Sequence, residues 1–251
     1  MEKVILCSYP RSGNTFIWKI MEEISGTLTG SDCLPKGKLN FDLYEQGLWA
    51  EGKVGREVWM VKSHFPERSG TDMHIANKCV LVVRNPLDCL VSFFNMGVTA
   101  SHNNSIHDDD YELIKDVFDT YIREEIKVWK EFHSYWCDGH VPIPTYVVRY
   151  EDLMKKKFET VCEIFSFLLN VPSIEGTVIE GLIWRNVELS KNEVYKPWKG
   201  KAYANWDWFS PELYKHIKRE VGSMLKRLDY VKNDEGEGQF TDDEDIAFSE
   251  T

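Results

Sequence analysis

The chain has 251 residues, of which 43% are hydrophobic and 28% charged, a composition typical of a globular protein with a substantial core. Its formal net charge is −11, but eight acidic residues fall in residues 233–251, which contain no Lys or Arg. Residues 1–232 are therefore only mildly acidic. They lack the basic stripe of a nucleic-acid-binding protein and any apolar run of the roughly 18 residues that a membrane span needs.

We expect one domain over residues 1–232 and an acidic, disordered tail over residues 233–251, because the tail is polar and has no hydrophobic periodicity. Residues 1–3 lead directly into an apolar run, so the sequence predicts no signal peptide. The six cysteines form no Cys-x-x-Cys pair, which is typical of reduced thiols. These features predict a cytoplasmic protein without membrane attachment.

Short apolar runs alternate with helical patterns, which predicts a single α/β domain with a central parallel sheet flanked by helices. The predicted strands are Val4–Ser8, Val58–Lys62, Cys79–Val83 and Thr145–Arg149. The predicted helices are Asn14–Ile24, Pro86–Phe94, Tyr111–Tyr135, Asp152–Leu169 and Ser210–Leu225. Segments 26–57, 97–110 and 190–209 are expected to be loops, and loops at the carboxyl ends of parallel strands bind ligands in such folds.

The first predicted strand runs into a loop with the properties of a phosphate site. The following helix presents unpaired N–H groups and the positive end of its dipole to this loop. Gly13 lets the backbone approach a phosphate, and Arg11 adds a cation with forked donors. A Walker A loop would have Lys where Asn14 stands, so the segment predicts a P-loop-like strand, loop and helix of another kind. The expected anion-binding residues are Arg11, Ser12, Gly13, Asn14 and Thr15.

Polar residues also follow the second and third predicted strands. Lys62 and His64 have a spacing of two, so both side chains leave the same face of an extended chain. His64 is then a candidate general base, and Lys62 can hold developing negative charge. Arg84 ends the third strand and Ser92 lies two turns into the next helix. Arg84 can bind a phosphate through two hydrogen bonds, or alternatively pair with Asp88.

These motifs resemble those of the sulfotransferase family. The family strings Tyr-Pro-Lys-Ser-Gly-Thr-Thr-Trp, Lys-Thr-His-Leu-Pro and Arg-Asn-Pro-x-Asp correspond to residues 9–16, 62–66 and 84–88. The resemblance implies the donor PAPS (3'-phosphoadenosine 5'-phosphosulfate), with its 5'-phosphosulfate on residues 11–15. It further implies that the 3'-phosphate binds Arg84 and Ser92.

Several positions match the family in part. Tyr150 corresponds to the Tyr of the family's Tyr-Glu-Asp, which helps place the nucleotide. Glu151 and Asp152 are expected to cap the helix that they open rather than to act as a pair of catalytic carboxylates. Arg11 stands where the family has Lys, so it would stabilise the departing phosphate by charge and hydrogen bonds alone. Phe16 replaces the Trp that stacks on adenine and still offers an aromatic face.

The final matching segment corresponds to the family's Arg-Lys-Gly at Lys199 and Gly200, with Trp198 in place of the Arg. Candidates for the missing cation are Lys196 and Lys201. The family's C-terminal dimer motif is absent, which leaves the oligomeric state open.

The resemblance implies an enzyme that moves a sulfuryl group from PAPS to a hydroxyl or amine of a small-molecule acceptor. His64 would act as general base, Lys62 and Arg11 would hold negative charge, and no metal would be needed. One alternative is a nucleotide or small-molecule kinase on a related P-loop fold, which would need a Walker Lys and a magnesium carboxylate. Another is a non-catalytic nucleotide-binding module, which would not need a base. A rival metal site, whose spacing is not diagnostic, comprises His102, His107, Asp108, Asp109 and Asp110.

Overall fold

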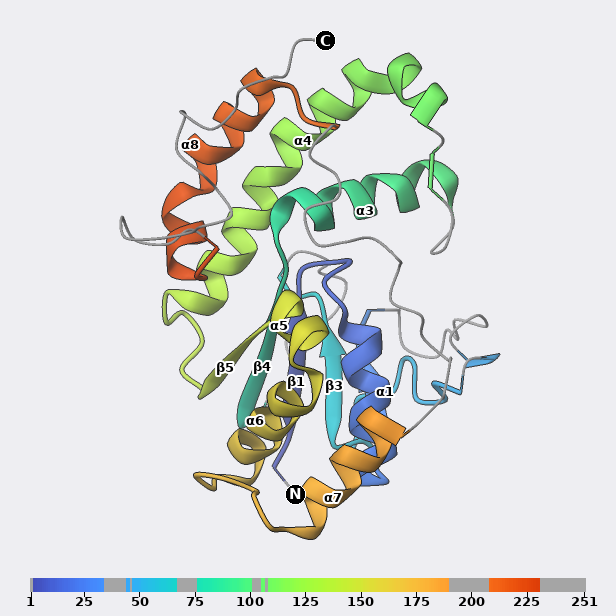
Figure 1. The fold of residues 1–251 in the computed structure, drawn as a ribbon, viewed down its shortest axis with the longest axis vertical. Coiled ribbons are helices and arrows are strands. Elements are labelled where there is room, and N and C mark those ends of the chain that lie inside the picture. The colour runs from blue at the N-terminus through green and yellow to red at the C-terminus, as the bar shows by residue number, and fades with distance from the viewer. Residues whose placement is uncertain are drawn as a thin grey trace.

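In a computed structural model of the chain, residues 2–33, 44–45, 47–66, 76–100, 105–106, 108–189 and 208–230 are described. Within them, five strands form one parallel sheet in the order β2-β3-β1-β4-β5, with β1 at its centre (Figure 1). The strands are β1 (Val4–Ser8), β2 (Thr29–Ser31), β3 (Met60–Ser63), β4 (Lys78–Val83) and β5 (Thr145–Arg149). The sheet confirms the predicted α/β fold with a central parallel sheet.

Both faces of the sheet are covered, as the continuous apolar runs of its central strands require. Every residue of β1 and β4 is buried. Side chains alternate across the sheet, so Ile5 and Cys7 of β1 pack into one core cluster, whereas Val4 and Leu6 pack into another.

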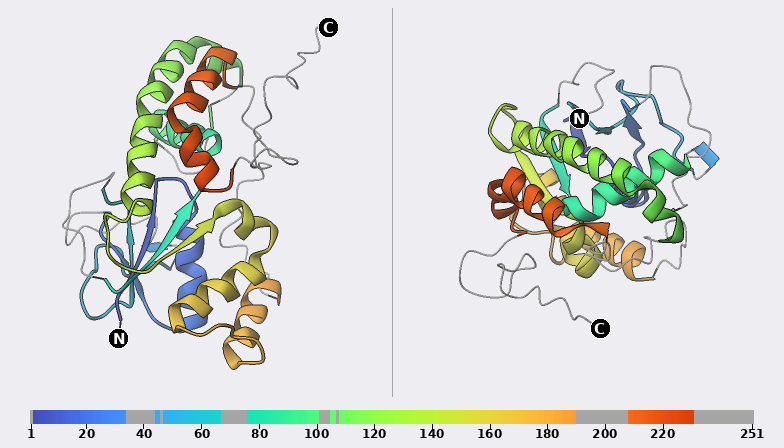
Figure 2. Two further views of the ribbon diagram at one scale, coloured as in Figure 1. Left: turned by 90° about the vertical axis from the view of Figure 1, so that its left-hand side faces the viewer. Right: turned by 90° about the horizontal axis from the view of Figure 1, so that it is seen from above.

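Helices of two groups complete these clusters. On the Val4 and Leu6 side lie α1 (Asn14–Ser25), α6 (Lys157–Leu169) and α7 (Val178–Trp184). On the other side lie α3 (Pro86–Thr99), α4 (Asp108–Cys137) and α8 (Pro211–Arg227). Figure 2 shows that α3, α4 and α8 extend beyond the carboxyl ends of the strands as a separate helical layer. None of the helices in the described ranges is long and apolar enough to cross a membrane.

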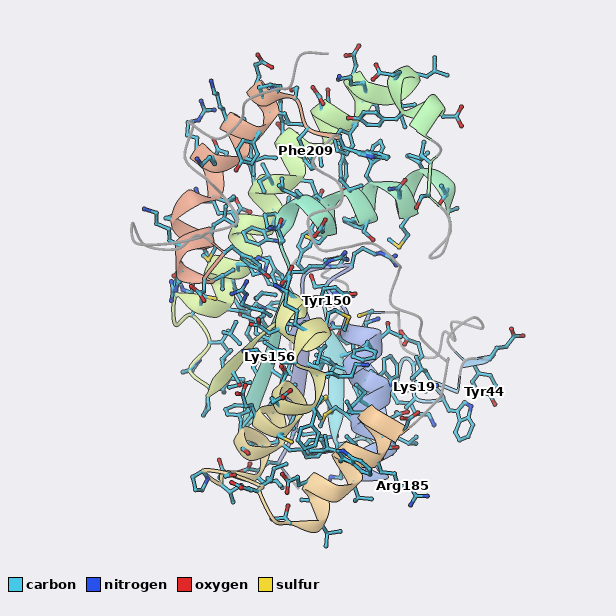
Figure 3. All side chains as sticks on the ribbon, in the orientation of Figure 1. Lys19, Tyr44, Tyr150, Lys156, Arg185 and Phe209 are labelled. Carbon is cyan, nitrogen blue, oxygen red and sulfur yellow. The ribbon has the colours of Figure 1, made fainter. Side chains whose placement is uncertain are left out.

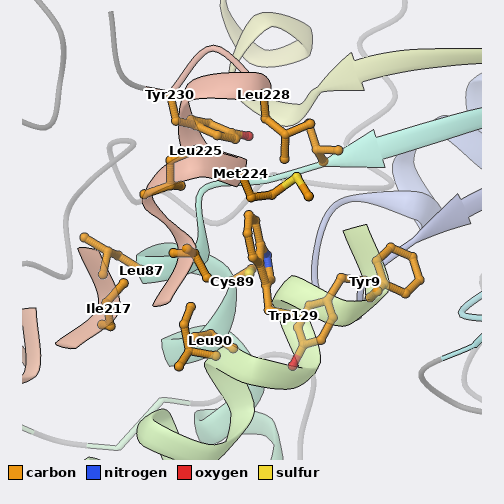
Figure 4. Packing of buried hydrophobic residues seen from close by; sticks show 14 of the residues in the cluster. Tyr9, Leu87, Cys89, Leu90, Trp129, Ile217, Met224, Leu225, Leu228 and Tyr230 are labelled. Carbon is orange, nitrogen blue, oxygen red and sulfur yellow. The ribbon is translucent and has the colours of Figure 1, made fainter. Parts of the chain in front are cut away.

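Trp129 of α4 is the centre of the larger cluster. It is fully buried, and Figure 4 shows it among Cys89 and Leu90 of α3 and Met224 of α8. A side chain of this size buries 150–250 Å², so it dominates the packing of the three helices. The helical layer is therefore fixed against the edge of the sheet where the strands end.

The predicted continuous helix Asp152–Leu169 is wrong. The chain forms α5 (Tyr150–Lys155) and then α6, with a break at Lys156, whose backbone leaves the helical region at φ −132° and ψ 55°. The two helices serve different surfaces, because α6 packs against the sheet through residues such as Ile164 and Phe165, whereas Glu151 of α5 contacts the end of β4. One straight helix could not make both the α6 contacts with the sheet and the Glu151 contact with the end of β4.

Shorter elements also differ from the predictions. Strand β2 and residues 44–45, which are helical, lie within the predicted loop 26–57. Helix α7 and a π-helical turn (Arg185–Leu189) were not predicted, although Thr177 and Glu180 have the spacing of a capping box and the Thr177 side chain caps α7. Helix α3 continues to Thr99 and α4 begins at Asp108, which shortens the predicted loop 97–110. Most of segment 190–209, the boundary at residue 232 and the tail 233–251 lie outside the described residues.

His133 of α4 provides a test of the packing, because its ring is fully buried and its Nδ1 lies 2.7 Å from the carbonyl oxygen of Trp129. Burial lowers the pKa of His133 from 6.5 to about 4. As the pH falls from 6.5 to 4, the unfolded state takes up a proton that the folded state does not, so stability is lost in this window. This group should lower the free energy of unfolding by about 3 kcal/mol between pH 7 and pH 4.

Urea unfolding at several pH values measures this effect. The variant His133→Asn keeps a donor for the Trp129 carbonyl and should lose this part of the pH dependence, whereas His140→Asn, at an exposed histidine, should retain it. Equal pH dependence of wild type and His133→Asn would contradict the prediction.

Candidate functional site

The loop between β1 and α1 contains residues with a left-handed backbone, which also occur in the main-chain turns that bind anions. Arg11 has φ 67° and Gly13 has φ 99°, and the Gly13 carbonyl accepts the first hydrogen bonds of α1 from the N–H groups of Phe16 (3.1 Å) and Ile17 (3.3 Å). A Cβ on Gly13 would lie 2.6 Å from Cδ2 of the Tyr150 ring. Glycine is therefore required here by both backbone conformation and space.

The same loop carries buried polar atoms that no group in the described ranges satisfies. They are the hydroxyl oxygens of Ser8 and Ser12 and both polar side-chain atoms of Asn14. Ser12 and Asn14 are 1% and 4% exposed. Buried polar groups in native proteins almost always have partners. The two hydroxyls and the Asn14 NH₂ are donors, and donors next to a helix N-terminus fit a phosphate or sulfate group, which would accept their hydrogen bonds.

Arg84 lies beside this loop, immediately after β4. Its Nη1 donates a 2.7 Å hydrogen bond to the Arg11 carbonyl, and its guanidinium carbon lies 4.7 Å from the centroid of the Tyr150 ring. Its Nε is buried and has no hydrogen-bond partner within the described part of the chain. Figure 3 shows Tyr150 at the junction between the sheet and the helical layer. Stacking and one hydrogen bond thus orient Arg84 while a donor remains for a ligand.

The Arg11 side chain connects the loop to α3. Its Nε donates a 2.9 Å hydrogen bond to the hydroxyl of Ser92. The structure therefore brings together four residues that the sequence assigned to an anion site: Arg11, Arg84, Ser92 and Tyr150. In this arrangement Arg11 lies at the second predicted phosphate position as well as in the loop.

Lys62 and His64 occupy the end of β3 and the residue just beyond it. Lys62 is 9% exposed, and its Nζ lies 5.8 Å from the centroid of the Trp18 ring of α1, within cation–π range. His64 Nδ1 lies 2.7 Å from the carbonyl oxygen of Ser8 at the end of β1. A carbonyl only accepts, so the neutral ring carries its proton on Nδ1 and its lone pair on Nε2. The adjacency of the two side chains stays a prediction.

Sequence reasoning missed the roles of Trp18 and Glu151. Glu151 does not cap α5, which has no side-chain cap; its carboxylate accepts a 2.9 Å hydrogen bond from the main-chain N–H of Asn85, next to Arg84. Burial raises the pKa of Glu151, and this bond opposes the shift. No local pattern distinguishes such a glutamate from a solvated acid at a helix start.

Other predicted site residues remain untested. Phe16 is 9% exposed, and Lys157 Nζ lies over its ring, 5.4 Å from the centroid, so a cation already covers one face of the ring. Lys196, Trp198, Lys199, Gly200, Lys201, His102 and His107 lie outside the described residues. In the described ranges, no group of three or more His, Cys, Asp or Glu residues is arranged to hold a metal ion.

Comparison with known proteins identifies the family. A family profile described as "Sulfotransferase domain" matches residues 54–196, more than half of the chain. The chain belongs to the sulfotransferase domain family. The matched segment contains Lys62, His64, Arg84, Ser92 and Tyr150, and the family resemblance of the sequence motifs is thereby confirmed.

Solved structures share the fold of this sulfotransferase domain. The mouse sulfotransferase SULT7A1 complexed with PAP superposes with a TM-score of 0.52 at 16% identity, covering 90% of this chain and 88% of that one. Retinol dehydratase in a complex with retinol and PAP gives a TM-score of 0.53 at 22% identity, covering 92% and 83%.

Curated relatives include WSCD family members of insects. The protein of Aedes aegypti is 26% identical over 231 residues, which are 90% of this chain and 67% of that protein. The protein of Drosophila melanogaster is 24% identical over 196 residues, which are 76% of this chain and 59% of that protein. The aligned part of this chain thus covers 59% to 67% of the length of these relatives.

Proposed function

We propose that the chain transfers a sulfuryl group from PAPS to a hydroxyl or amine of a small-molecule acceptor, with His64 as general base. The observation that carries this proposal is that Arg11 links the phosphate loop (residues 11–15) to a second anion site, which consists of Arg84 and Ser92. The Arg11 carbonyl accepts from Arg84 and the Arg11 side chain donates to Ser92. Two phosphate-binding positions held in a fixed relation suit a nucleotide that carries phosphates at both the 5' and the 3' position of its ribose.

The residues fit the donor on chemical grounds. PAPS, when bound, supplies the sulfuryl group and a phosphate leaving group. The buried donors of Ser12 and Asn14 would bind the 5'-phosphosulfate at the N-terminus of α1. Arg84 and Ser92 would bind the 3'-phosphate, and the Tyr150 ring already orients Arg84. Cationic side chains supply the positive charge that a metal supplies in other phosphate sites.

His64 would act on the acceptor. Its Nδ1–H is directed to the Ser8 carbonyl, so the lone pair on Nε2 can take the proton of an acceptor hydroxyl as its oxygen attacks sulfur. The bond from sulfur to the bridging phosphate oxygen breaks in the same step. Lys62 and Arg11 would hold the negative charge that develops on that oxygen. The retinol and PAP named in the retinol dehydratase structure support a nucleotide donor beside a small-molecule acceptor.

The donor is tested by thermal unfolding and product analysis. PAP, the desulfated product of the proposed donor, should raise the melting temperature, and ATP with magnesium should do so much less. Release of PAP from PAPS should depend on an added acceptor from a panel of phenols, alcohols, amines and sugars. Strong stabilisation by ATP without a response to PAP would favour a kinase instead.

Arg84→Ala should weaken PAP binding by about 1.5–3 kcal/mol, the usual contribution of a charge-assisted hydrogen bond. Binding of 5'-AMP, which lacks the 3'-phosphate, should weaken less, because it loses only the support that Arg84 gives to the Arg11 carbonyl, and isothermal titration of both nucleotides measures the difference. Arg219→Ala removes an exposed arginine of α8 as a matched control. Equal weakening of both nucleotides by Arg84→Ala would assign Arg84 a structural role.

His64→Ala should reduce turnover by roughly 10²–10⁴-fold, the contribution typical of a general base. PAP affinity should stay near the wild-type value, and the lower limb of the pH–rate profile should disappear where chemistry limits the rate. His140→Ala, at an exposed histidine, is the control. Wild-type turnover by His64→Ala with a hydroxyl acceptor would eliminate the base assignment, and joint loss of folding and binding would make His64 a structural residue.

A further inference from the structure

A buried carboxylate joins three elements next to the second anion site. Glu151, in the first turn of α5, is 3% exposed. One oxygen accepts the Asn85 N–H at 2.9 Å, and the other accepts the hydroxyl of Tyr230 at 2.8 Å. Asn85 follows β4 and Tyr230 follows α8, so this carboxylate connects the β4–α3 junction, α5 and the end of α8.

Consecutive residues of α5 hold consecutive residues of the β4–α3 junction. The Tyr150 ring stacks on the Arg84 guanidinium, and the Glu151 carboxylate binds the Asn85 main chain. Asn85 is fully buried, and its side chain accepts a 2.8 Å hydrogen bond from the Leu87 N–H as the cap of α3. The main chain is therefore fixed at Asn85, immediately after Arg84, and the Arg84 side chain is held by the Tyr150 ring.

Tyr230 is itself held in place on both sides. Its main-chain N–H donates to the Leu225 carbonyl at 2.8 Å, and its ring lies 4.6 Å from the guanidinium carbon of Arg149. The side chain is 2% exposed, and Figure 4 shows it beside Leu225 and Leu228. A side chain so constrained cannot follow Glu151 if the carboxylate moves, so it restricts the positions that Glu151 can adopt.

We propose that Tyr230 and Glu151 are positioning residues for the 3'-phosphate site, acting through Asn85 on the orientation of Arg84. The inference deepens the proposed function and rests on it. Without the Tyr230 hydroxyl, one oxygen of a buried carboxylate loses its donor, which is costly, and Glu151 relaxes toward another partner. The Asn85 main chain and Arg84 then shift, and a phosphate contact depends steeply on such geometry.

The primary test is Tyr230→Phe, which removes one oxygen atom and keeps the ring on Arg149. Calorimetry should show the ratio of PAP affinity to 5'-AMP affinity falling by about 3- to 30-fold, the range of couplings carried through packed networks. The control is Tyr146→Phe, because the Tyr146 hydroxyl also donates to a glutamate, Glu163, at 2.8 Å, but from a partly buried position on β5. Tyr146→Phe should leave the ratio unchanged.

Glu151→Gln completes a double-mutant cycle. Its amide oxygen can still accept from Asn85, while its NH₂ group can only donate, so any bond to the Tyr230 hydroxyl reverses direction and loses the charge of the carboxylate. If the two residues act through the charge-assisted hydrogen bond, Tyr230→Phe should change the affinity ratio less in the Glu151→Gln background than in the wild-type background. Fully additive effects would overturn the proposal. If Glu151→Gln does not fold, the result for Tyr230→Phe decides alone.

The outcomes separate this inference from the proposed function. If wild-type protein prefers PAP over 5'-AMP and Tyr230→Phe retains the same preference, the positioning role is wrong and the proposed function stands. If wild-type protein shows no such preference, the 3'-phosphate site is absent and both proposals fail. A lower melting temperature of Tyr230→Phe with an unchanged affinity ratio also overturns the positioning role, because it indicates structural support alone.

Discussion

The Arg84 guanidinium donates a hydrogen bond to the main-chain carbonyl of Arg11, and this bond joins the ends of two neighbouring strands. Arg11 adopts a left-handed backbone conformation, which is unfavourable for a residue with a Cβ and needs support from its surroundings. Holding this carbonyl helps to keep the loop in that conformation at the start of α1. The same guanidinium lies on the Tyr150 ring, which also fills the space next to Gly13. Loop, strand end and ring therefore depend on one another.

The site can form because parallel strands end at the same edge of the sheet. β3, β1, β4 and β5 are neighbours in register, so residues that follow them converge although they are distant in sequence. The helical layer built around Trp129 stabilises this edge from beyond the strands. Buried donors such as Ser12 Oγ remain without partners in the described structure, which costs stability. A bound anion would recover that free energy, so ligand binding should stabilise the fold.

Helix α1 also supports the proposed cation of the reaction. The Trp18 ring lies under Lys62, and its indole N–H donates to Glu22 at 2.8 Å. Glu22 in turn accepts a 2.6 Å hydrogen bond from the Thr29 N–H, where β2 begins. Burial raises the pKa of Glu22, and these two hydrogen bonds oppose the shift. The short strand β2, which has no apolar pattern of its own, is thus anchored to the helix that contacts Lys62.

The sequence by itself determined the elements whose signal is local. Apolar runs located β1, β3, β4 and β5, and the residues after them carried the motifs that assigned the family. Only the tertiary structure decided what those residues contact. Glu151 resembles a solvated helix-start acid in sequence, yet its partner Tyr230 lies 79 residues away. The break at Lys156, the left-handed Arg11 and the ring beneath Lys62 were likewise invisible, because each depends on groups brought together by packing and not by chain neighbours.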